Sequence, residues 1–579
     1  MANHSSQQAL HRHLRDVLRG LAGGAALALS AAPLAAQGAG ALDPGFGAGG
    51  KAMFDFQQST DIAHAVAVQP DGKLVIAGLT YTDNDYSKED FALLRLQPDG
   101  TPDASFGVGG RVTTDFPGLA AVVSSVVVQP DGKLLVAGGA FPLVTFLGDF
   151  KLARYNPDGS LDEGFGAGGI VTTSFPGQGS YAFALALQPD GRILAAGTDF
   201  VNFSGGASSD TDFALARYLP DGTPDSSFGN GGTVVTDIAG FDDDVFSVLL
   251  QPDGRIVAVG SARTLATHYD FAAARYLPDG TLDASFGTGG TVRTDFGNND
   301  FDRAHAACLQ PDGKLLAAGF TIFNGGLSQP FALARYGTDG TLDSSFDGDG
   351  KLLIDFGSFS QAAHALLAQP DGKLVVVGFA DTESSDSDFL LARCDGSGAL
   401  DASFGVGGKV RTSFGNLNGG AFGAALQTDG RIVAAGFQAT FTSVGVELAV
   451  ARYLGDSPWT NLGGALAGIA GPPRLAGTGT LFPGSSGGLS LAAAAPSAAG
   501  ALFFALDSTP APFHCGTLVP VPVLGTVLLL ASATGTASVT WSSWPAGLSG
   551  LDLFLQAAVQ DAAAPCNVAL SNALLADVP

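Results

Sequence analysis

Three short segments of the chain each carry two aspartates separated by one residue, a spacing that could hold a cation. Carboxylate oxygens on turns are the ligands that calcium prefers, although no segment has the full spacing of an EF-hand loop. An acidic surface also serves solubility alone, and this alternative stays open. Calcium is therefore the one cofactor that the sequence suggests. The candidate ligands are Asp83 and Asp85, Asp242 and Asp244, and Asp347 and Asp349.

Histidines could form a second kind of metal site, because neutral imidazole is a common ligand of transition metals. Three of them, His64, His305 and His364, occupy the same repeated position, five residues before a Gln that begins a turn. Aromatic residues at this position in other repeats favour packing over metal binding. The remaining residues at this position are Ser124, Phe183, Phe246 and Phe422.

Two glycine-rich motifs imitate nucleotide-binding or catalytic signatures. Gly-x-Gly-Gly recurs along the chain, but each copy precedes a strand pattern, so turn geometry explains it better than dinucleotide binding. Residues 484–488 match the Gly-x-Ser-x-Gly motif of hydrolases, but no helix pattern follows them. We therefore predict no catalytic residue and no cofactor-binding residue in this chain.

One Arg, one Asp and one Phe recur in every repeat. Because a catalytic site is normally built once, this recurrence indicates a structural role. We expect each Arg to hydrogen-bond carboxylate or carbonyl groups of its repeat, and each Phe to pack between repeats. The arginines are Arg95, Arg154, Arg217, Arg275, Arg335, Arg393 and Arg452. The phenylalanines are Phe46, Phe106, Phe165, Phe228, Phe286, Phe346 and Phe404, and the aspartates are Asp43, Asp103, Asp162, Asp225, Asp283, Asp343 and Asp401.

These residues are set in a repeat marked by the turn Gln-Pro-Asp-Gly. Six copies of the turn lie in one register that begins at Gln69, a seventh position in this register has Thr428 in place of Pro, and the steps between these positions are 58 to 63 residues. Pro presets φ for the first central position and Gly accepts the left-handed conformation, so the motif predicts a tight hairpin. Short apolar runs on both sides of it, a run ending in the Arg and a run after the Phe predict four strands per repeat.

Seven repeats of four short strands predict an all-β fold, a seven-bladed β-propeller rather than a sandwich or a solenoid. The array begins with an isolated strand of the fourth type at residues 50–56 and ends with a strand of the third type at residues 446–453. We therefore expect the N-terminal strand to close the last blade, which would remove the open edges of the ring.

The segment Leu282–Gly290, taken with the hairpin Gln-Pro-Asp-Gly-Lys-Leu-Leu, resembles the bacterial delta-60 repeat, a β-propeller repeat of unknown function. The resemblance spans residues 42–454, and we place the propeller domain at residues 42–457. It implies the propeller fold and secretion, but no activity. Departures are confined to single blades, such as Asp347 in place of a Gly.

Both ends of the chain differ from the repeats. Arginines precede an Ala-rich apolar run and small residues within residues 1–36, which is the pattern of a signal peptide. From residue 459 the repeat disappears, and alternating runs predict a small β-sandwich over residues 459–579. This region is similar to β-rich C-terminal modules of exported bacterial proteins, with a low-complexity linker as the alternative. Cys515 and Cys566 lie in it, and export would permit a disulfide between them.

Composition narrows the choice of partners. The 28 Lys and Arg against 54 Asp and Glu give a net charge of −26, which argues against a nucleic-acid partner because phosphate binding needs a basic face. No later apolar run has the length of a membrane helix. We expect a monomer that is secreted, periplasmic or attached to the cell surface.

The sequence is compatible with two classes of function. The first is a non-enzymatic scaffold whose variable loops bind an unknown extracellular ligand, either a glycan, a protein or a surface. The alternative is an extracellular polysaccharide-acting enzyme, a lyase or a hydrolase. Histidines or paired carboxylates with shifted pKa values at the channel mouth would favour the enzyme, and an aromatic groove without titratable groups would favour binding.

Overall fold

The computed structural model describes most of residues 38–456 and, beyond them, mainly strands. The predicted signal peptide at residues 1–36 lies outside the described part. Every regular element within that part is a strand, and it contains no helix long and apolar enough to cross a membrane. The described residues are 38–56, 60–81, 88–142, 144–145, 147–201, 210–264, 268–297, 301–322, 329–358, 360–381, 387–415, 418–427, 429–439, 445–456, 459–463, 473–479, 487–492, 494, 497–505, 511–513, 516–518, 525–532, 536–541, 551–561, 568–571 and 573–578.

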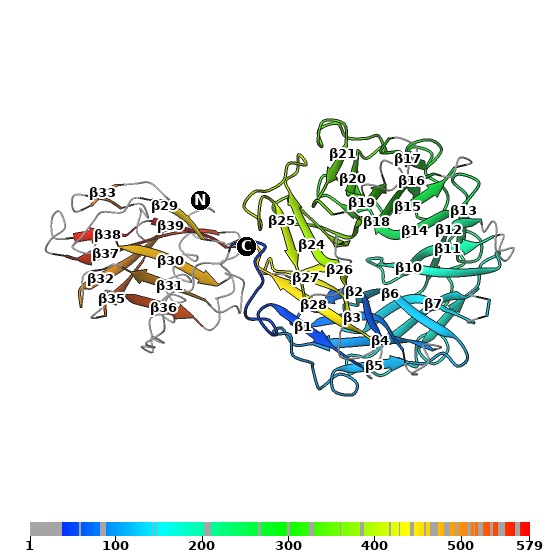
Figure 1. Cartoon of the computed structure of the whole chain (residues 1–579), viewed down its shortest axis with the longest axis horizontal. Helices are drawn as coiled ribbons and strands as arrows, with labels where there is room; N and C mark the ends of the chain where they lie inside the picture. Colours follow the sequence, from blue (N-terminus) through cyan, green and yellow to red (C-terminus); the bar gives the residue numbers. More distant parts are fainter. Residues whose placement is uncertain are drawn as a thin grey trace, which may run out of the picture. The chain divides into compact units, whose positions relative to one another are not determined.

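The chain forms two compact units. One comprises Ala39–Leu454, and the other comprises Gly455–Pro579 together with residues 1–38. The first unit contains seven four-stranded sheets, in agreement with the expected all-β propeller of seven blades (Figure 1). Blades are numbered 1 to 7 in the order of their first strands.

Each blade is an antiparallel sheet whose strands pair in chain order. Blade 1 is β2 (Asp61–Val68), β3 (Leu74–Tyr81), β4 (Glu89–Leu96) and β5 (Arg111–Thr114); blade 2 is β6 (Ala120–Val128), β7 (Leu134–Phe141), β8 (Asp149–Tyr155) and β9 (Ile170–Thr173). Blade 3 is β10 (Gly179–Leu187), β11 (Ile193–Phe200), β12 (Thr211–Tyr218) and β13 (Thr233–Thr236); blade 4 is β14 (Asp243–Leu250), β15 (Ile256–Arg263), β16 (Tyr269–Tyr276) and β17 (Thr291–Thr294). Blade 5 is β18 (Phe301–Leu309), β19 (Leu315–Ile322), β20 (Phe331–Tyr336) and β21 (Lys351–Ile354); blade 6 is β22 (Ser360–Ala368), β23 (Leu374–Asp381), β24 (Ser387–Cys394) and β25 (Lys409–Thr412).

Blade 7 combines the two ends of the ring. It contains β26 (Gly419–Leu426), β27 (Ile432–Ala439), β28 (Val446–Tyr453) and the N-terminal strand β1 (Lys51–Phe54). Strand β1 pairs antiparallel with β28, as the sequence predicted. This pairing gives the backbone groups of β28 a partner on both sides, so the last blade has the same four-stranded form as the others.

The first strand of each blade lies at the centre of the ring. Each of these seven strands contacts the first strands of both neighbouring blades, and β26 of blade 7 contacts β2 of blade 1. The middle strands of each blade are apolar and buried over almost their whole length, because both of their faces pack against neighbouring blades. The core therefore consists of apolar layers between successive sheets.

The Gln-Pro-Asp-Gly turns form the tight hairpins that their residue types predict. In blade 1 the amide of Gln69 donates to the carbonyl of Lys73 at 2.8 Å, and the amide of Gly72 donates back to the carbonyl of Gln69 at 2.9 Å. Gly72 has a φ of 83°, the left-handed conformation that favours glycine. Local chemistry alone thus determines the connection between the first and second strands of a blade.

The recurrent Arg residues join neighbouring blades. Arg275 is buried, and its Nε lies 2.8 Å from Oδ2 of Asp283 in its own blade. Its second nitrogen donates to the hydroxyl of Ser285, its third donates to the carbonyl of Thr338 in the next blade, and the guanidinium lies over the ring of Phe286. The predicted carboxylate and carbonyl partners are therefore present in this blade, with the carbonyl supplied by the following one.

The same arrangement also closes the ring. Arg452 of blade 7 pairs with Asp43, covers the ring of Phe46 and donates to the carbonyl of Pro98 in blade 1. These contacts join residues near both ends of the ring unit, alongside the pairing of β1 with β28. Arg275 and Arg452 thus bind groups of their own repeat, as expected, and also a backbone carbonyl of the next blade.

The second unit contains the strands β29 to β39. A sheet of six strands has the order β29, β39, β37, β32 and β35, with β38 also paired to β37; β30, β31 and β36 form a second sheet, and β33 pairs with β34. Whether these sheets form a sandwich stays a prediction. Cys515 and Cys566 lie outside the described residues. The strands are β29 (Trp459–Gly463), β30 (Arg474–Gly479), β31 (Gly487–Ala492), β32 (Ala499–Ala505), β33 (Ala511–Phe513), β34 (Gly516–Leu518), β35 (Gly525–Leu530), β36 (Ala537–Trp541), β37 (Leu551–Gln560), β38 (Val568–Leu570) and β39 (Ala573–Val578).

Candidate functional site

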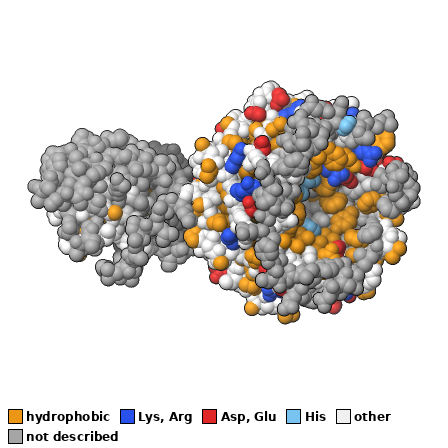
Figure 2. All heavy atoms as spheres, in the orientation of Figure 1, with side chains coloured by type: hydrophobic (Ala, Val, Ile, Leu, Met, Phe, Trp, Pro, Cys, Tyr) orange, Lys and Arg blue, Asp and Glu red, His pale blue; other side chains and the backbone are white. Residues whose placement is uncertain are grey.

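A belt of side chains follows the seven inner strands around the centre of the ring. It consists of the residues that lie five positions before each turn Gln, and we call it the axial belt. Figure 2 shows that the ring unit is hollowed at its centre, with hydrophobic side chains and histidines in the hollow. The belt residues are partly exposed. They are His64, Ser124, Phe183, Phe246, His305, His364 and Phe422.

Ring contacts connect most of the axial belt. The ring centroid of Phe246 lies 5.1 Å from those of Phe183 and His305, and the rings of His305 and His364 stack at 4.4 Å. Phe422 continues the belt, because its centroid lies 5.0 Å from His364 and 5.7 Å from His64. Six aromatic or imidazole rings are thus in contact in sequence from Phe183 round to His64. Ser124, which has no ring, occupies the seventh position of the belt.

A β-bulge in each inner strand positions the belt. In blade 5 the pairing of β18 with β19 shifts between Ala304 and Ala306, so His305 has no residue opposite it. The bulge brings the carbonyl of Arg303 so close to Gly319 that a Cβ on this glycine would lie 1.8 Å from the oxygen. A recurrent glycine in the second strand therefore permits the bulge, and bulges commonly redirect side chains near functional sites.

The sequence contains a signal for this bulge, although the predictions from the sequence did not include the bulge. A glycine follows the last residue of every turn by six positions, in the middle of an apolar strand. An isolated glycine within a strand pattern indicates a bulge or a close backbone approach. The glycines are Gly78, Gly138, Gly197, Gly260, Gly319, Gly378 and Gly436.

The belt histidines are neutral. Nδ1 of His64 lies 2.8 Å from the carbonyl oxygen of Val123, and Nδ1 of His305 lies 3.2 Å from that of Ala363, so both nitrogens donate. Burial lowers the pKa of His64, and burial together with the nearby Arg303 lowers the pKa of His305 to about 4. Each ring therefore keeps its proton on Nδ1 and presents Nε2 as a lone pair.

The three belt histidines are not all neighbours: the rings of His305 and His364 stack, and His64 lies further along the belt. Among the described residues, the groups of three or more ligands close enough to hold one ion consist of aspartates only. The ring of Phe422 contacts both His64 and His364 and lies between them in the belt. Transition-metal binding by the belt histidines stays a prediction.

Three aromatic side chains from second strands, together with Phe301 at the start of β18, extend the belt on one side, and we call this set the aromatic wall. The ring centroid of Phe320 lies 5.4 Å from that of His305, Phe379 lies 5.4 Å from His364, and Phe437 lies 5.6 Å from Phe422. Phe301 stacks on Phe320 at 6.4 Å. The wall, Phe301, Phe320, Phe379 and Phe437, thus covers blades 5 to 7.

Charged side chains gather next to the wall, between blades 3, 4 and 5, and we call them the polar cluster. Arg263 and the hydroxyl of Tyr269 both donate to Oδ2 of Asp242 at 2.7 Å. Arg303 lies with Nη2 3.4 Å from Asp244 and with its guanidinium 4.5 Å from the ring centre of Tyr269. Each of these residues occurs in one blade only, because the equivalent positions of the other blades carry different residue types. The recurrent Arg residues, in contrast, occur in every blade.

Burial shifts the pKa values of two groups in the polar cluster. Burial raises the pKa of Asp244, although Arg303 and the hydroxyls of Thr211 and Thr198 act in the opposite direction. Burial and the neighbouring Asp242 raise the pKa of Tyr269, which makes this phenol a poor base. Asp244 is thus a carboxylate of the cluster whose pKa is raised.

The sequence-predicted calcium ligands are distributed over three different environments. Asp83 and Asp85 lie outside the described residues. Asp242 and Asp244 are engaged by the cations of the polar cluster, as described above. Asp347 and Asp349 belong to the turn before β21, where Asp347 has a φ of 49° and Asp349 accepts the amide of Lys351 at 2.9 Å.

Two other groups of carboxylates meet between blades, and sequence reasoning did not identify them. Each group combines an Asp of a third strand, an Asp after the fourth strand and the first Asp of the next blade. The residues are Asp212, Asp237 and Asp243, and Asp270, Asp295 and Asp302. Calcium binding stays a prediction.

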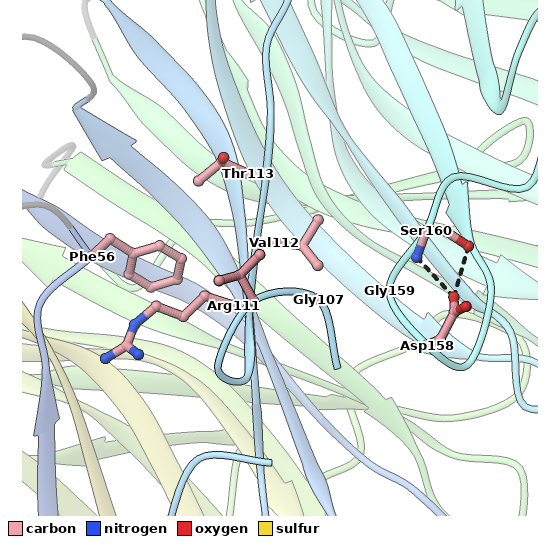
Figure 3. Close-up of a pocket in the computed structure, with 9 residues that line it drawn as sticks. Phe56, Gly107, Arg111, Val112, Thr113, Asp158, Gly159 and Ser160 are labelled. Atoms are coloured by element: carbon pink, nitrogen blue, oxygen red, sulfur yellow. Dashed lines mark hydrogen bonds between the residues drawn. The ribbon is translucent and has the colours of Figure 1, made fainter. Parts of the chain in front are cut away.

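A groove with a volume of ≈ 650 Å³ lies beside β5. Figure 3 shows Arg111 beside Phe56, and Asp158 hydrogen-bonded to the amide and hydroxyl of Ser160. A cation covers the corresponding Phe at other blade junctions, for example Lys351 over Phe296. This recurrence indicates a structural groove.

The described cysteines are not reactive. Cys308 and Cys394 are free, and both pack in the apolar layer between blades 5 and 6. Burial raises the pKa of each thiol to about 12, so the nucleophilic thiolate form is scarce at neutral pH.

Comparison with protein families matches six segments of the ring to one family, described as "Domain of unknown function (DUF5122) beta-propeller". Each segment begins at the Gln of a Gln-Pro-Asp-Gly turn and ends at the recurrent Phe. Six repeats of the ring thus match the model of an uncharacterised β-propeller family. The turn with Thr428 is not among the matched segments of that family. The matched residues are 69–106, 129–165, 188–228, 251–286, 310–346 and 369–404.

Comparison with curated proteins found no match. Solved structures that resemble the chain include an acylaminoacyl peptidase of Pyrococcus horikoshii, with 12% identity, a TM-score of 0.35 and coverage of 76% of this chain and 59% of that chain. The chain thus spans about three fifths of the peptidase. An ulvan lyase has 10% identity, a TM-score of 0.38 and coverage of 70% and 96%. An α-L-arabinofuranosidase of Fusarium graminearum has 10% identity, a TM-score of 0.34 and coverage of 59% and 96%. Such identities do not transfer an activity to this chain.

Proposed function

We propose that this protein is an exported, non-enzymatic propeller that binds an extracellular ligand in the central hollow. One observation carries the proposal: the side chains that do not recur, those of the polar cluster, lie beside the axial belt and the aromatic wall. Scaffold residues recur in every blade, whereas a binding site needs residues that differ. A mostly apolar concave surface with a few convergent polar groups is typical of ligand sites.

A glycan is the ligand class that these side chains suit best. The aromatic wall offers ring faces on which the apolar face of a sugar can pack. Arg263, Arg303 and the carboxylates beside them offer hydrogen bonds for hydroxyl groups. Export rests on the signal-peptide pattern of residues 1–36 and is part of the proposal.

A second candidate is the polysaccharide-acting enzyme, because titratable side chains do occur at the hollow. Asp244 with its raised pKa is the carboxylate that could act as a general acid. His305, with a pKa of about 4, is a weak base at neutral pH. The raised pKa of Tyr269 also argues against a base, so the binding function is the stronger proposal.

A glycan screen with the full chain, run with and without calcium, tests the proposal. We expect at least one oligosaccharide to bind without being cleaved, and Phe379→Ala to weaken that binding. Val108→Ala is the matched control, because Val108 is 87% exposed and lies on a turn outside the hollow. Absence of binding to any glycan would refute the glycan proposal, and cleavage of a bound glycan would favour the enzyme.

A further inference from the structure

Arg303 is the residue of the hollow whose hydrogen-bonding capacity is least used. It occupies the position seven residues before the turn Gln, two residues before His305 of the axial belt. This position carries no other cation in the ring, so the scaffold does not require one. The equivalent residues are Ile62, Val122, Tyr181, Asp244, Ala362 and Gly420.

The surroundings hold the guanidinium in place without satisfying it. It lies 4.5 Å from the ring centre of Tyr269 and 5.2 Å from that of Phe301, which are cation–π distances. Its one hydrogen bond within the described residues is the long contact of 3.4 Å from Nη2 to Asp244. Nε has no partner there. A guanidinium has five N–H donors, so most of them are unused in the described part.

The neighbouring carboxylates do not compete strongly for Arg303. Asp242 is held at 2.7 Å by Arg263 and by Tyr269. Asp244 accepts hydrogen bonds from the hydroxyls of Thr198 and Thr211 through its other oxygen, each at 3.2 Å. The side chain of Arg303 is 27% exposed although its Nε is buried, so a ligand would reach the terminal nitrogens of the guanidinium.

We propose that the hollow binds an acidic sugar, one carrying a carboxylate or a sulfate, and that Arg303 holds this anionic group. The inference rests on the proposed function and specifies its ligand class. The guanidinium fork matches a carboxylate or sulfate with two parallel hydrogen bonds. Phe301 contacts both Arg303 and Phe320, so the aromatic wall continues from the anion position and offers ring surface to the sugar.

Because the net charge is −26, the protein does not attract an acidic sugar over long distances. The protein as a whole repels an anionic chain at low salt, and physiological salt screens charges beyond about 8 Å. The preference for the charged sugar therefore depends on direct contact with the fork of Arg303. Lysine at this position would keep the charge but lose the fork.

Calorimetric titration of the full chain at physiological salt tests the inference with two matched pairs of probes. The first pair is hexagalacturonate and its methyl ester, and the second is a dextran sulfate oligomer and unmodified dextran of the same length. In at least one pair we expect the charged probe to bind about tenfold tighter or more. The pair that shows this preference distinguishes the carboxylate from the sulfate.

Variants assign the preference to Arg303. Arg303→Gln should bind the charged and neutral members equally, and Arg303→Lys should retain part of the preference. Arg293→Gln is the matched control, because it removes the same charge from a residue that is 44% exposed and lies on a fourth strand; it should keep the preference. A melting temperature close to that of the parent chain must accompany each variant, and Arg303→Lys serves if Arg303→Gln fails to fold.

Three results would each overturn a different claim. Equal or tighter binding of the neutral member in both pairs would refute the acidic-sugar inference while leaving glycan binding intact. A charge preference that persists in both Arg303 variants would also refute the role of Arg303. Absence of binding by all four probes, together with an empty glycan screen, would instead refute the proposed function.

Discussion

Replacing Arg275 by alanine should destabilise the ring, because one side chain holds two blades together. The change removes a buried ion pair of 2.8 Å to Asp283 and the hydrogen bond to the carbonyl of Thr338 in the next blade. It also removes the hydrogen bond of 3.1 Å to Ser285. The guanidinium side chain is 6% exposed, so water does not replace these partners.

The magnitude follows from what remains near Asp283 after the substitution. Breaking a buried ion pair by removing one partner costs about 3–5 kcal/mol. Asp283 keeps a second cation, Arg255, at 2.9 Å, so we expect a loss at the lower end, about 3 kcal/mol. Arg255→Ala is the matched control. Its side chain is 36% exposed, and an exposed pair contributes only about 0–1 kcal/mol.

Chemical denaturation of the two variants and the parent chain, followed by circular dichroism, measures the difference. The expected order of stability is parent, then Arg255→Ala close below it, then Arg275→Ala clearly lower. An Arg275→Ala variant with an unchanged denaturation midpoint would refute the conclusion that the recurrent Arg residues hold neighbouring blades together. If both variants lost the same free energy of unfolding, the stabilisation would come from positive charge near Asp283 and not from the contacts of Arg275 with the next blade.

Four further predictions concern the ring. Deleting residues 42–56 should lower thermal stability and cause association, because β28 then has an open edge; an unchanged, monodisperse protein in scattering would contradict the closure. Gly319→Ala should destabilise by about 1–3 kcal/mol in denaturation, since overpacking forces the backbone apart. Burial raises the pKa of Asp61 to about 6, so its contribution to stability falls as pH rises from about 4 to 6. Asp61→Asn should flatten this pH profile. Calorimetry with millimolar calcium tests cation binding, and absence of both heat and stabilisation would exclude it.

Much of the ring could be predicted from local chemistry. Pro, Asp and Gly determine each hairpin through their preferred φ values, independently of distant residues. The order of strand types along the chain also predicted that β1 joins β28, because an unpaired first strand and an incomplete last blade complement each other. Arg275 was assigned a structural role from its recurrence, although its bond to Thr338 in the next blade was not foreseen.

The candidate site was harder to predict, for two physical reasons. The bulge at His305 changes the direction of one side chain per blade, and simple alternation along a strand does not include such a shift. The contact between Arg303 and Asp244 joins residues of two blades, so it depends on how neighbouring sheets pack. The same limit applies to the three histidines at one strand position, because the sequence does not show which of their rings touch: His305 and His364 stack, whereas Phe422 lies between His364 and His64.

By itself, the sequence determined the repeated hairpins, the four strands of each blade, their number and the completion of blade 7, because these depend on short-range residue preferences and on counting. Only the tertiary structure decided which side chains share the central hollow. Rotation of the blades about a common centre brings equivalent positions of neighbouring blades side by side, and this places Arg303 of blade 5 beside Asp244 of blade 4. Through-space packing of residues about sixty positions apart has no local signature in the chain.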